Sequence, residues 1–272
     1  MFTVGVSIAL LIWLLAVALA APFIFGPWQP PEAITEIGRL IDQQFQLTFL
    51  LTGLIFITAQ FALGYAVLRF GRKRSEPAST TEGNDRWEIL WTSAAAVIFV
   101  GLALLGYSVW AEVRFDRAAG DAPPPDLTVE VVAQQFVWNF RYAGADGRFG
   151  PTQAELIDDS IGNAVGVDRD HADGADDLIT ARLAVPVNQE IELLLKAKDV
   201  LHNFFVPELR VKLDTVPGLT NRLRIRPETI GTYEIACSEL CGLGHYKMRA
   251  YLDVMSEADY EAWLQEQAQY LY

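Results

Sequence analysis

Three long apolar stretches constrain the fold of this chain more than any other feature. Val4 to Phe25 contains no charged residue, and Gln46 to Leu68 is a second uncharged run. A third runs from Trp87 to Trp110, with Glu88 at its edge. Because an α-helix needs about 20 apolar residues to cross a bilayer, each run is long enough to span one. The sequence therefore predicts N-terminal transmembrane helices followed by a water-soluble part.

Basic residues indicate how the helices are oriented. Arg69 and the cluster Arg72 to Arg74 follow the second run directly, and such clusters mark the cytoplasmic side. Everything after Arg114 is then expected on the periplasmic side of a bacterial-type inner membrane. The first run is either a retained helix or a signal-like segment. Ala18 to Ala20 resembles a cleavage site, but no Lys or Arg precedes the run.

The soluble half shows the two-residue period of β-strands. Thr128 to Tyr142 alternates, which predicts one face made of Val132, Phe136, Trp138, Phe140 and Tyr142. Further β-like stretches are separated by turn residues, and they are Ile179–Val185, Ile191–Leu195, Val200–Val206, Asn221–Ile225, Thr232–Ala236 and Ala250–Val254. This pattern favours an antiparallel β-sandwich. A short helix from Ser256 to Tyr272 follows, with Ser256 as its N-cap.

An acidic insertion, residues 143–178, interrupts the strand pattern. Seven aspartates lie between Asp158 and Asp177, without the spacing of an EF-hand, so we expect a solvated loop rather than a calcium site. The expected organisation has three parts: a first apolar helix or signal-like segment (1–26), a transmembrane helical hairpin with a cytoplasmic basic loop (27–114), and a periplasmic domain (115–272).

The net charge of −13 argues against nucleic acid as a partner, because phosphate needs a basic surface. An acidic soluble domain suits a basic protein partner, which it would attract at long range. The same acidity could serve only to keep the domain soluble.

One segment near the C-terminus carries the donor atoms of a metal site. It reads Cys237-Ser-Glu239-Leu-Cys241-Gly-Leu-Gly-His245-Tyr-Lys-Met248, and His202 lies upstream. Thiolate, imidazole and thioether together are a copper donor set, and two cysteines in one loop can bridge two copper ions. A zinc site would not need the methionine, and a disulfide would need neither histidine, so both remain as alternatives.

Two segments resemble the cytochrome c oxidase subunit II family: Asp-Val-Leu-His-Asn-Phe-Phe-Val-Pro-Glu-Leu-Arg-Val-Lys-Leu-Asp-Thr-Val-Pro-Gly at 199–218, and the Cys237–Met248 loop. The similarity runs from about Gln46 to the C-terminus and is weakest in the acidic insertion. It implies a cupredoxin-like domain with a binuclear copper centre.

The resemblance also implies a role for each donor. Cys237 and Cys241 would be the bridging thiolates, and His202 and His245 would each bind one copper ion. The weak ligands would be Met248 and the carbonyl of Glu239, and the Glu239 side chain would reach a magnesium or manganese site at subunit I.

In the family, electrons enter through an aromatic segment, here Gln135 to Tyr142. Phe136 stands where the family usually has tryptophan, and Trp138 could take its place. Asp199 and Asp214 match positions near which a basic donor would dock.

Two further positions match residues that the family directs toward subunit I or the cytoplasm. Arg210 would lie in the segment facing subunit I. Glu88 matches a glutamate at the mouth of a proton channel, although a carboxylate there also favours the start of a helix.

The resemblance implies subunit II of a respiratory haem–copper oxidase, which is not catalytic on its own. It would accept electrons from cytochrome c or another periplasmic donor and pass them to the haem of subunit I, for oxygen reduction coupled to proton translocation. Its partners would be subunit I, other oxidase subunits and membrane lipids. No Cys-x-x-Cys-His motif occurs, so the donor would be a separate protein.

Other protein classes share some of these features. A membrane-tethered copper chaperone or store and the copper domain of nitrous oxide reductase are alternatives to the oxidase. A quinol-oxidising relative is disfavoured, because such subunits lack the copper ligands.

Overall fold

The computed structural model describes residues 2–25, 30–70, 83–111 and 123–270. The chain divides into two compact units, one of residues 1–30 and 41–110 and the other of residues 31–40 and 111–272. The basic cluster Arg72 to Arg74 and the expected boundary at Arg114 lie outside the described residues.

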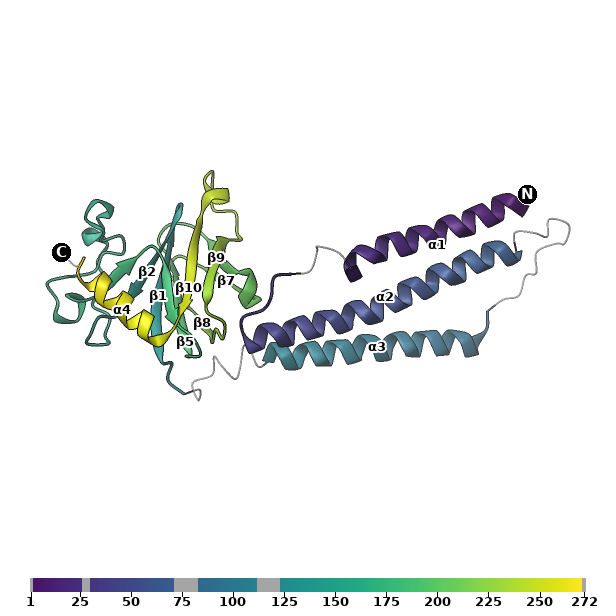
Figure 1. The fold of residues 1–272 in the computed structure, drawn as a ribbon, viewed down its shortest axis with the longest axis horizontal. Coiled ribbons are helices and arrows are strands. Elements are labelled where there is room, and N and C mark those ends of the chain that lie inside the picture. The colour runs from purple at the N-terminus through teal and green to yellow at the C-terminus, as the bar shows by residue number, and fades with distance from the viewer. Residues whose placement is uncertain (1, 26–29, 71–82, 112–122, 271–272) are drawn as a thin grey trace. The chain divides into compact units, whose positions relative to one another are not determined.

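The first unit consists of apolar helices. They are α1 (Phe2–Phe25), α2 (Glu36–Phe70), whose first turns belong to the second unit, and α3 (Asp85–Ala111) (Figure 1). All three are long enough to cross a membrane, with mean hydropathies of 2.6, 1.9 and 2.2. The Trp13 ring of α1 stacks on Phe61 of α2, with 5.2 Å between centroids. It also lies over Gly64, where an added Cβ would come within 2.3 Å of the indole, so α1 packs closely on α2.

The second unit is a β-sandwich of two five-stranded sheets, ordered β3-β2-β1-β5-β8 and β4-β10-β9-β6-β7 (Figure 1). The strands are β1 (Leu127–Gln134), β2 (Val137–Tyr142), β3 (Leu178–Thr180), β4 (Leu183–Pro186), β5 (Ile191–Ala197), β6 (His202–Val206), β7 (Val211–Thr215), β8 (Asn221–Ile225), β9 (Gly231–Cys237) and β10 (Arg249–Met255). Apolar side chains of both sheets fill the core between them. The predicted sandwich is confirmed.

Strand pairing is mostly antiparallel. The exceptions are the parallel pairs β1–β5 and β4–β10. Each sheet therefore contains one parallel pair among antiparallel ones. The stretch expected as one strand over Ile179–Val185 is two strands in different sheets, β3 and β4, because the chain changes sheet around Ala181 and Arg182.

The segment Thr128 to Tyr142 is a hairpin rather than one alternating strand. Trp138, Phe140 and Tyr142 are buried in the core of the sandwich, whereas Val132 lies in a separate apolar cluster with Val165 and Val167. The single face that we expected is therefore wrong at Val132. The reason is the turn at residues 135–136, which resets the alternation of side chains between the two strands.

Pro31 to Leu40 belongs to the sandwich unit, although it precedes the second apolar run. Ile34 is only 3% exposed, and its backbone bonds to both Glu208 (3.0 Å) and Glu228 (2.8 Å). Arg39 forms an ion pair with Glu228. This ten-residue segment therefore completes one edge of the soluble unit instead of acting as a free linker.

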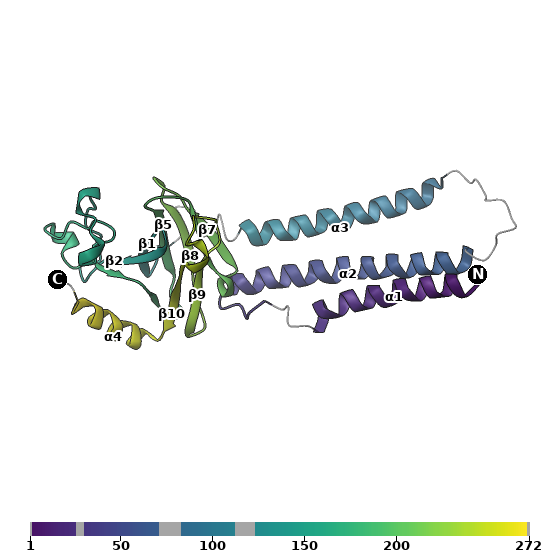
Figure 2. The same cartoon turned by 90° about the horizontal axis from the view of Figure 1, so that it is seen from above.

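The C-terminal helix α4 (Glu257–Ala268) covers part of the sandwich (Figure 2). The Ser256 hydroxyl accepts a hydrogen bond from the Asp259 amide (3.2 Å), which confirms the expected N-cap. Trp263 of α4 packs edge-on against Tyr142, with 5.3 Å between ring centroids. The helix is thereby packed against the core of the sandwich, where it also contacts β4 of the other sheet.

Candidate metal centre

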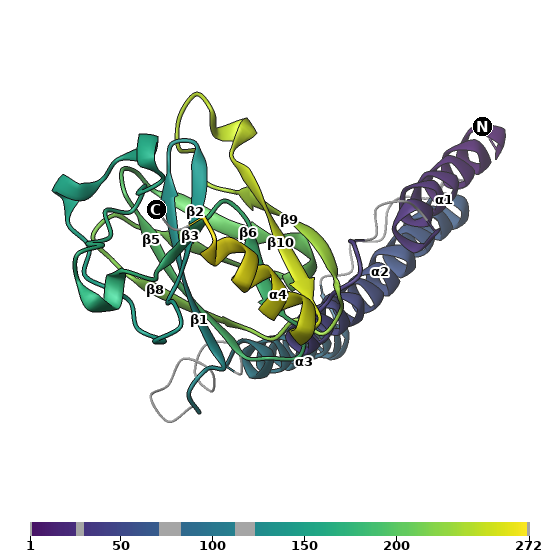
Figure 3. The same ribbon diagram turned by 60° about the vertical axis from the view of Figure 1, so that its left-hand side comes forward.

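The donor-bearing loop joins β9 to β10 and extends from the same end of the sandwich as the β1–β2 turn (Figure 3). Cys237 is the last residue of β9, and His202 is the first residue of β6. These two strands pair antiparallel, with Phe204 opposite Cys237. The cysteine and the histidine therefore lie at the same end of the sheet. Sheet pairing therefore joins two parts of the sequence that lie far apart.

The structure brings all six predicted ligands together. Cys237 Sγ lies 3.9 Å from Cys241 Sγ, 3.9 Å from His202 Nδ1 and 3.1 Å from the Glu239 carbonyl oxygen. Cys241 Sγ lies 3.6 Å from His245 Nδ1 and 3.7 Å from Met248 Sδ. Within the described residues, His202, Cys237 and Cys241 form a group whose ligand atoms all lie within 4.8 Å of one another.

These separations fit donors that share a metal ion. Two ligands about 2.0–2.3 Å from one tetrahedral ion lie about 3.3–3.8 Å apart, close to the distances found here. Both cysteines are free rather than joined in a disulfide. The soft sulfur and imidazole donors suit a thiophilic metal, so the residues present fit the implied cofactor.

Four of the donor side chains are shielded from water, while His245 is half-buried. His202 is fully buried, and Cys237, Cys241 and Met248 are 8%, 4% and 2% exposed. Burial, together with the neighbouring Cys237, raises the pKa of the Cys241 thiol to about 11. In the metal-free chain this thiol is protonated at neutral pH, so metal binding must release a proton there.

Asp199 orients the ring of His202. Its carboxylate lies 2.8 Å from His202 Nε2, which leaves Nδ1 directed at Cys237. The backbone amides of Gln135 and Val200 donate to the same carboxylate, each at 2.7 Å. Burial alone would favour the neutral acid, but these hydrogen bonds outweigh it and hold the pKa of Asp199 below its usual value.

The turn between β1 and β2 packs on the donor loop. The Gln135 side chain donates a hydrogen bond to the Cys241 carbonyl. Phe136 lies against Gly242 and Gly244, and a Cβ added at Gly244 would come within 2.4 Å of its ring. Gly242 has a φ of 138°, a conformation that favours glycine. Both glycines therefore allow Phe136, which is half-buried, to reach the loop.

A second set of hydrogen bonds ties the loop to β6 and β7. The Asn203 side chain donates to Asp214 (2.6 Å) and accepts from the Ser238 hydroxyl (2.5 Å). Asp214 is half-buried, so its carboxylate supports the base of the loop instead of standing free on the surface.

The remaining predicted site residues lie in different environments. Trp138 is 2% exposed, with its ring edge-on to His202 at 6.3 Å between centroids, so it lies in the core rather than on the surface. Arg210 donates hydrogen bonds to the carbonyls of Pro207 (2.5 Å) and Pro31. Glu88 is exposed in the first turn of α3, in the other unit.

Sequence reasoning assigned no role to Gln135, Asn203 or Ser238, although all three contact the donor loop or its supports. Their roles depend on partners far away in the sequence, and only the strand pairing reveals them. A polar residue at the tip of a hairpin gives no such signal by itself.

The comparisons with known proteins agree with this geometry. Residues 127–255 match the family described as cytochrome c oxidase subunit II, periplasmic domain, and residues 32–109 match its transmembrane domain. The alternative cytochrome c oxidase subunit 2 of Bradyrhizobium diazoefficiens is 36% identical over 96% of this chain and 92% of that protein.

Two further proteins are similar to parts of the chain. Cytochrome c oxidase subunit 2 of Cereibacter sphaeroides is 32% identical over 89% of this chain and 79% of that protein. The crystal structure of the periplasmic domain of subunit II from Bradyrhizobium japonicum aligns with a TM-score of 0.40 and 25% identity, over 55% of this chain and 99% of that one. The chain belongs to the cytochrome c oxidase subunit II family.

Proposed function

We propose that this chain accepts electrons from a separate donor protein at a centre of two copper ions and passes them to the haem of subunit I. The observation that carries this proposal is the convergence of six donor atoms, two of them cysteine sulfurs 3.9 Å apart. As a subunit of a haem–copper oxidase, the chain would act together with subunit I and the other oxidase subunits, in which oxygen reduction and proton translocation take place.

The distances support the ligand roles that the family resemblance implies. Cys237 and Cys241 would bridge the two ions, and each sulfur lies beside a histidine that would bind one of them. His202 and the Glu239 carbonyl lie beside Cys237, and His245 and Met248 lie beside Cys241. The bound copper pair would supply one-electron redox chemistry that two bridging thiolates can share.

Two observations favour copper over zinc and over an exchangeable store. Met248 is 2% exposed and directs its thioether at Cys241, a contact that a structural zinc site would not need. His202 and both cysteines are buried, whereas a carrier that hands metal to another protein needs exposed ligands.

Residues around the centre would control how electrons arrive and leave. Phe136, packed on the donor loop, is the aromatic residue through which electrons would enter. Trp138 would take part in electron transfer from within the core, where its ring lies edge-on to that of His202. Glu239 is exposed on the loop, so its side chain could reach magnesium or manganese at the interface with subunit I.

The apolar helices support a proposal for the membrane topology. We infer a multi-pass protein of a bacterial-type inner membrane, with the sandwich on the periplasmic side, where cytochrome c or an equivalent donor would reach it. Asp199 and Asp214 would add negative charge near the docking surface, and Arg210 would face subunit I. Glu88 would collect protons at the cytoplasmic side.

Copper content and electron paramagnetic resonance (EPR) spectra test the proposal. The full chain should be purified in detergent, because residues 31–40 form part of the sandwich unit and a fragment starting at residue 115 would lack them. We expect two copper ions per chain and a mixed-valence signal shared over both nuclei, which Cys237→Ser abolishes. One copper with a mononuclear blue-type signal, or zinc instead, would overturn the binuclear assignment. Co-purification with a many-helix haem subunit would distinguish an oxidase from a copper store.

A further inference from the structure

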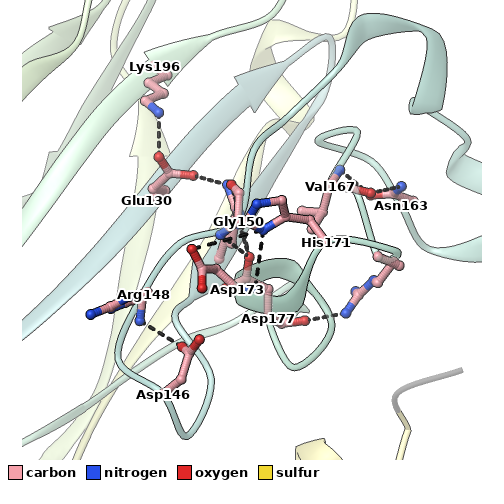
Figure 4. Close-up of polar contacts among 12 residues, drawn as sticks. Glu130, Asp146, Arg148, Gly150, Asn163, Val167, His171, Asp173, Asp177 and Lys196 are labelled. Carbon is pink, nitrogen blue, oxygen red and sulfur yellow. Dashed lines mark hydrogen bonds and ion pairs between the residues drawn. The ribbon is translucent and has the colours of Figure 1, made fainter.

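The acidic insertion is a folded element anchored to the sandwich by a buried ion-pair network (Figure 4). Arg141 of β2 is 1% exposed and donates hydrogen bonds to Glu130 of β1 (2.9 Å) and to Asp177 (3.0 Å) at the end of the insertion. Asp177 also accepts a hydrogen bond from the Gly150 amide (3.0 Å), near the start of the insertion. Both ends of the insertion are therefore tied to the guanidinium group of Arg141. The insertion is thus anchored to the sandwich, which the expectation of a solvated loop did not include.

The middle of the insertion is held against the outer face of β1. The Asn163 side chain donates to the Val167 carbonyl (2.9 Å) and accepts from the Val167 amide (2.8 Å), which closes the turn 163–167. Val165 and Val167 pack on Val132 of β1. This turn includes Ala164, whose carbonyl faces the neighbouring β5–β6 loop.

Lys198 connects this turn to the loop that supports the metal centre. Its ammonium group donates to the Ala164 carbonyl (2.9 Å), and its backbone amide donates to Ala133 (2.9 Å). Its side chain is 24% exposed, and exposed Asp159 lies 3.8 Å from the ammonium group. The next residue is Asp199, which orients His202.

We propose that the acidic insertion is a positioning element for the metal centre, acting through Lys198 and Asp199 on the ring of His202. The insertion holds the Lys198 side chain, and the backbone hydrogen bond to Ala133 holds its main chain. The carboxylate of the next residue, Asp199, is thereby kept in place beside Nε2 of His202. Outer partners of a ligating histidine set the ring orientation and the ligand strength. The inference rests on the proposed function, since it requires His202 to bind metal.

The experiment compares Lys198→Met with Asn163→Ala in the full chain purified in detergent and titrated with copper. Lys198→Met removes the contact from the loop side, and Asn163→Ala loosens the turn that offers the Ala164 carbonyl. We expect each variant to lower copper affinity about tenfold, the smaller end of the effects known for outer partners of metal ligands. We also expect a changed EPR hyperfine pattern in the fully loaded protein. The double variant should lose little more than either single one, because both changes break the same connection.

Matched controls separate positioning from stability. Lys198→Arg should keep the affinity and the EPR pattern, and Asp170→Asn, at an exposed acid of the insertion, should leave both unchanged. If the single variants lower the unfolding temperature but leave affinity and EPR pattern unaltered, the insertion only stabilises the fold and the inference is wrong. Failure of the unaltered chain to bind copper would instead overturn the proposed function.

Discussion

His202 and Asp199 form a directed pair: the carboxylate lies 2.8 Å from Nε2, while Nδ1 on the other side of the ring faces Cys237 at 3.9 Å. A hydrogen bond from Nε2–H to the carboxylate fixes the tautomer that leaves the Nδ1 lone pair available to a metal ion. Asp199→Ala should therefore lower copper affinity by about 10–100-fold without unfolding the chain. A competition titration with a copper chelator measures this, and Asp170→Ala, an exposed acid in the insertion, is the control. Equal affinities in the two variants would refute the orienting role.

Met248 and Cys237 should respond differently to substitution. Met248→Leu keeps a buried side chain of similar volume, so the protein should still bind two copper ions but with an altered EPR spectrum, since only a weak ligand is lost. Cys237→Ser should abolish the shared signal altogether. Metal analysis and EPR on both variants check this, and loss of one copper from Met248→Leu would contradict a weak-ligand role.

Phe136 should control electron delivery by a protein donor. We expect Phe136→Ala to slow reduction of the copper centre by soluble cytochrome c about tenfold, as for an aromatic residue central to a contact surface. Copper content and reduction by dithionite should not change. Val137→Ala, at the exposed neighbouring residue, serves as the control in stopped-flow absorbance. An unchanged rate for Phe136→Ala would place the donor elsewhere.

The segment before α2 should contribute to the stability of the sandwich unit. Ile34 is 3% exposed, so Ile34→Ala should reduce the free energy of unfolding by about 2–4 kcal/mol, through lost burial and the cavity left behind. Ile161→Ala makes the same chemical change at a side chain that is 72% exposed and should cost less than about 0.5 kcal/mol. Thermal unfolding followed by circular dichroism compares the two, and similar values would show that the segment does not support the sandwich.

Asp253 should give the sandwich an acid-sensitive contribution to stability. Burial opposes its ionisation, but hydrogen bonds from Arg182 (2.6 and 2.7 Å) and Thr232 (2.7 Å) outweigh burial and lower its pKa. A carboxyl group whose pKa is lower in the folded state stabilises the fold above its unfolded pKa of about 3.9, and loses that effect as the pH falls through the folded value. Asp253→Asn should therefore be less stable than the parent at pH 7, with the difference shrinking below about pH 4.

Arg182→Met should reproduce this pH profile, because it removes the cation that pairs with the same carboxylate. Denaturant unfolding at several pH values measures both variants. A constant difference from the parent across the whole range would show that Asp253 is not the group responsible.

Local patterns predicted much of the fold. Hydropathy predicted the apolar helices, and the Ser256 cap predicted the start of α4, because both depend on neighbours in the sequence. β7 was not predicted, since only the 3-10 turn Pro207–Leu209 separates it from β6 and that turn has no glycine. The metal ligands could be predicted because five of the six lie within one loop of twelve residues.

Other features depend on distant contacts and could not be predicted. The Gln135 amide that reaches the Cys241 carbonyl, the burial of Ile34 beside Glu208 and Glu228, and the anchoring of the insertion by Arg141 all join separate parts of the chain. No periodicity or motif marks such residues, because the information lies in the pairing of strands.

The burial of Ile34 has a consequence for biogenesis. One piece of the sandwich precedes the second apolar helix, and the rest follows the third, so the unit is assembled from both ends of the polypeptide. Its edge cannot close when residues 31–40 leave the ribosome, because their partners Glu208 and Glu228 have not yet been synthesised. The last step in folding the sandwich should therefore follow membrane insertion of the helices that separate the two pieces.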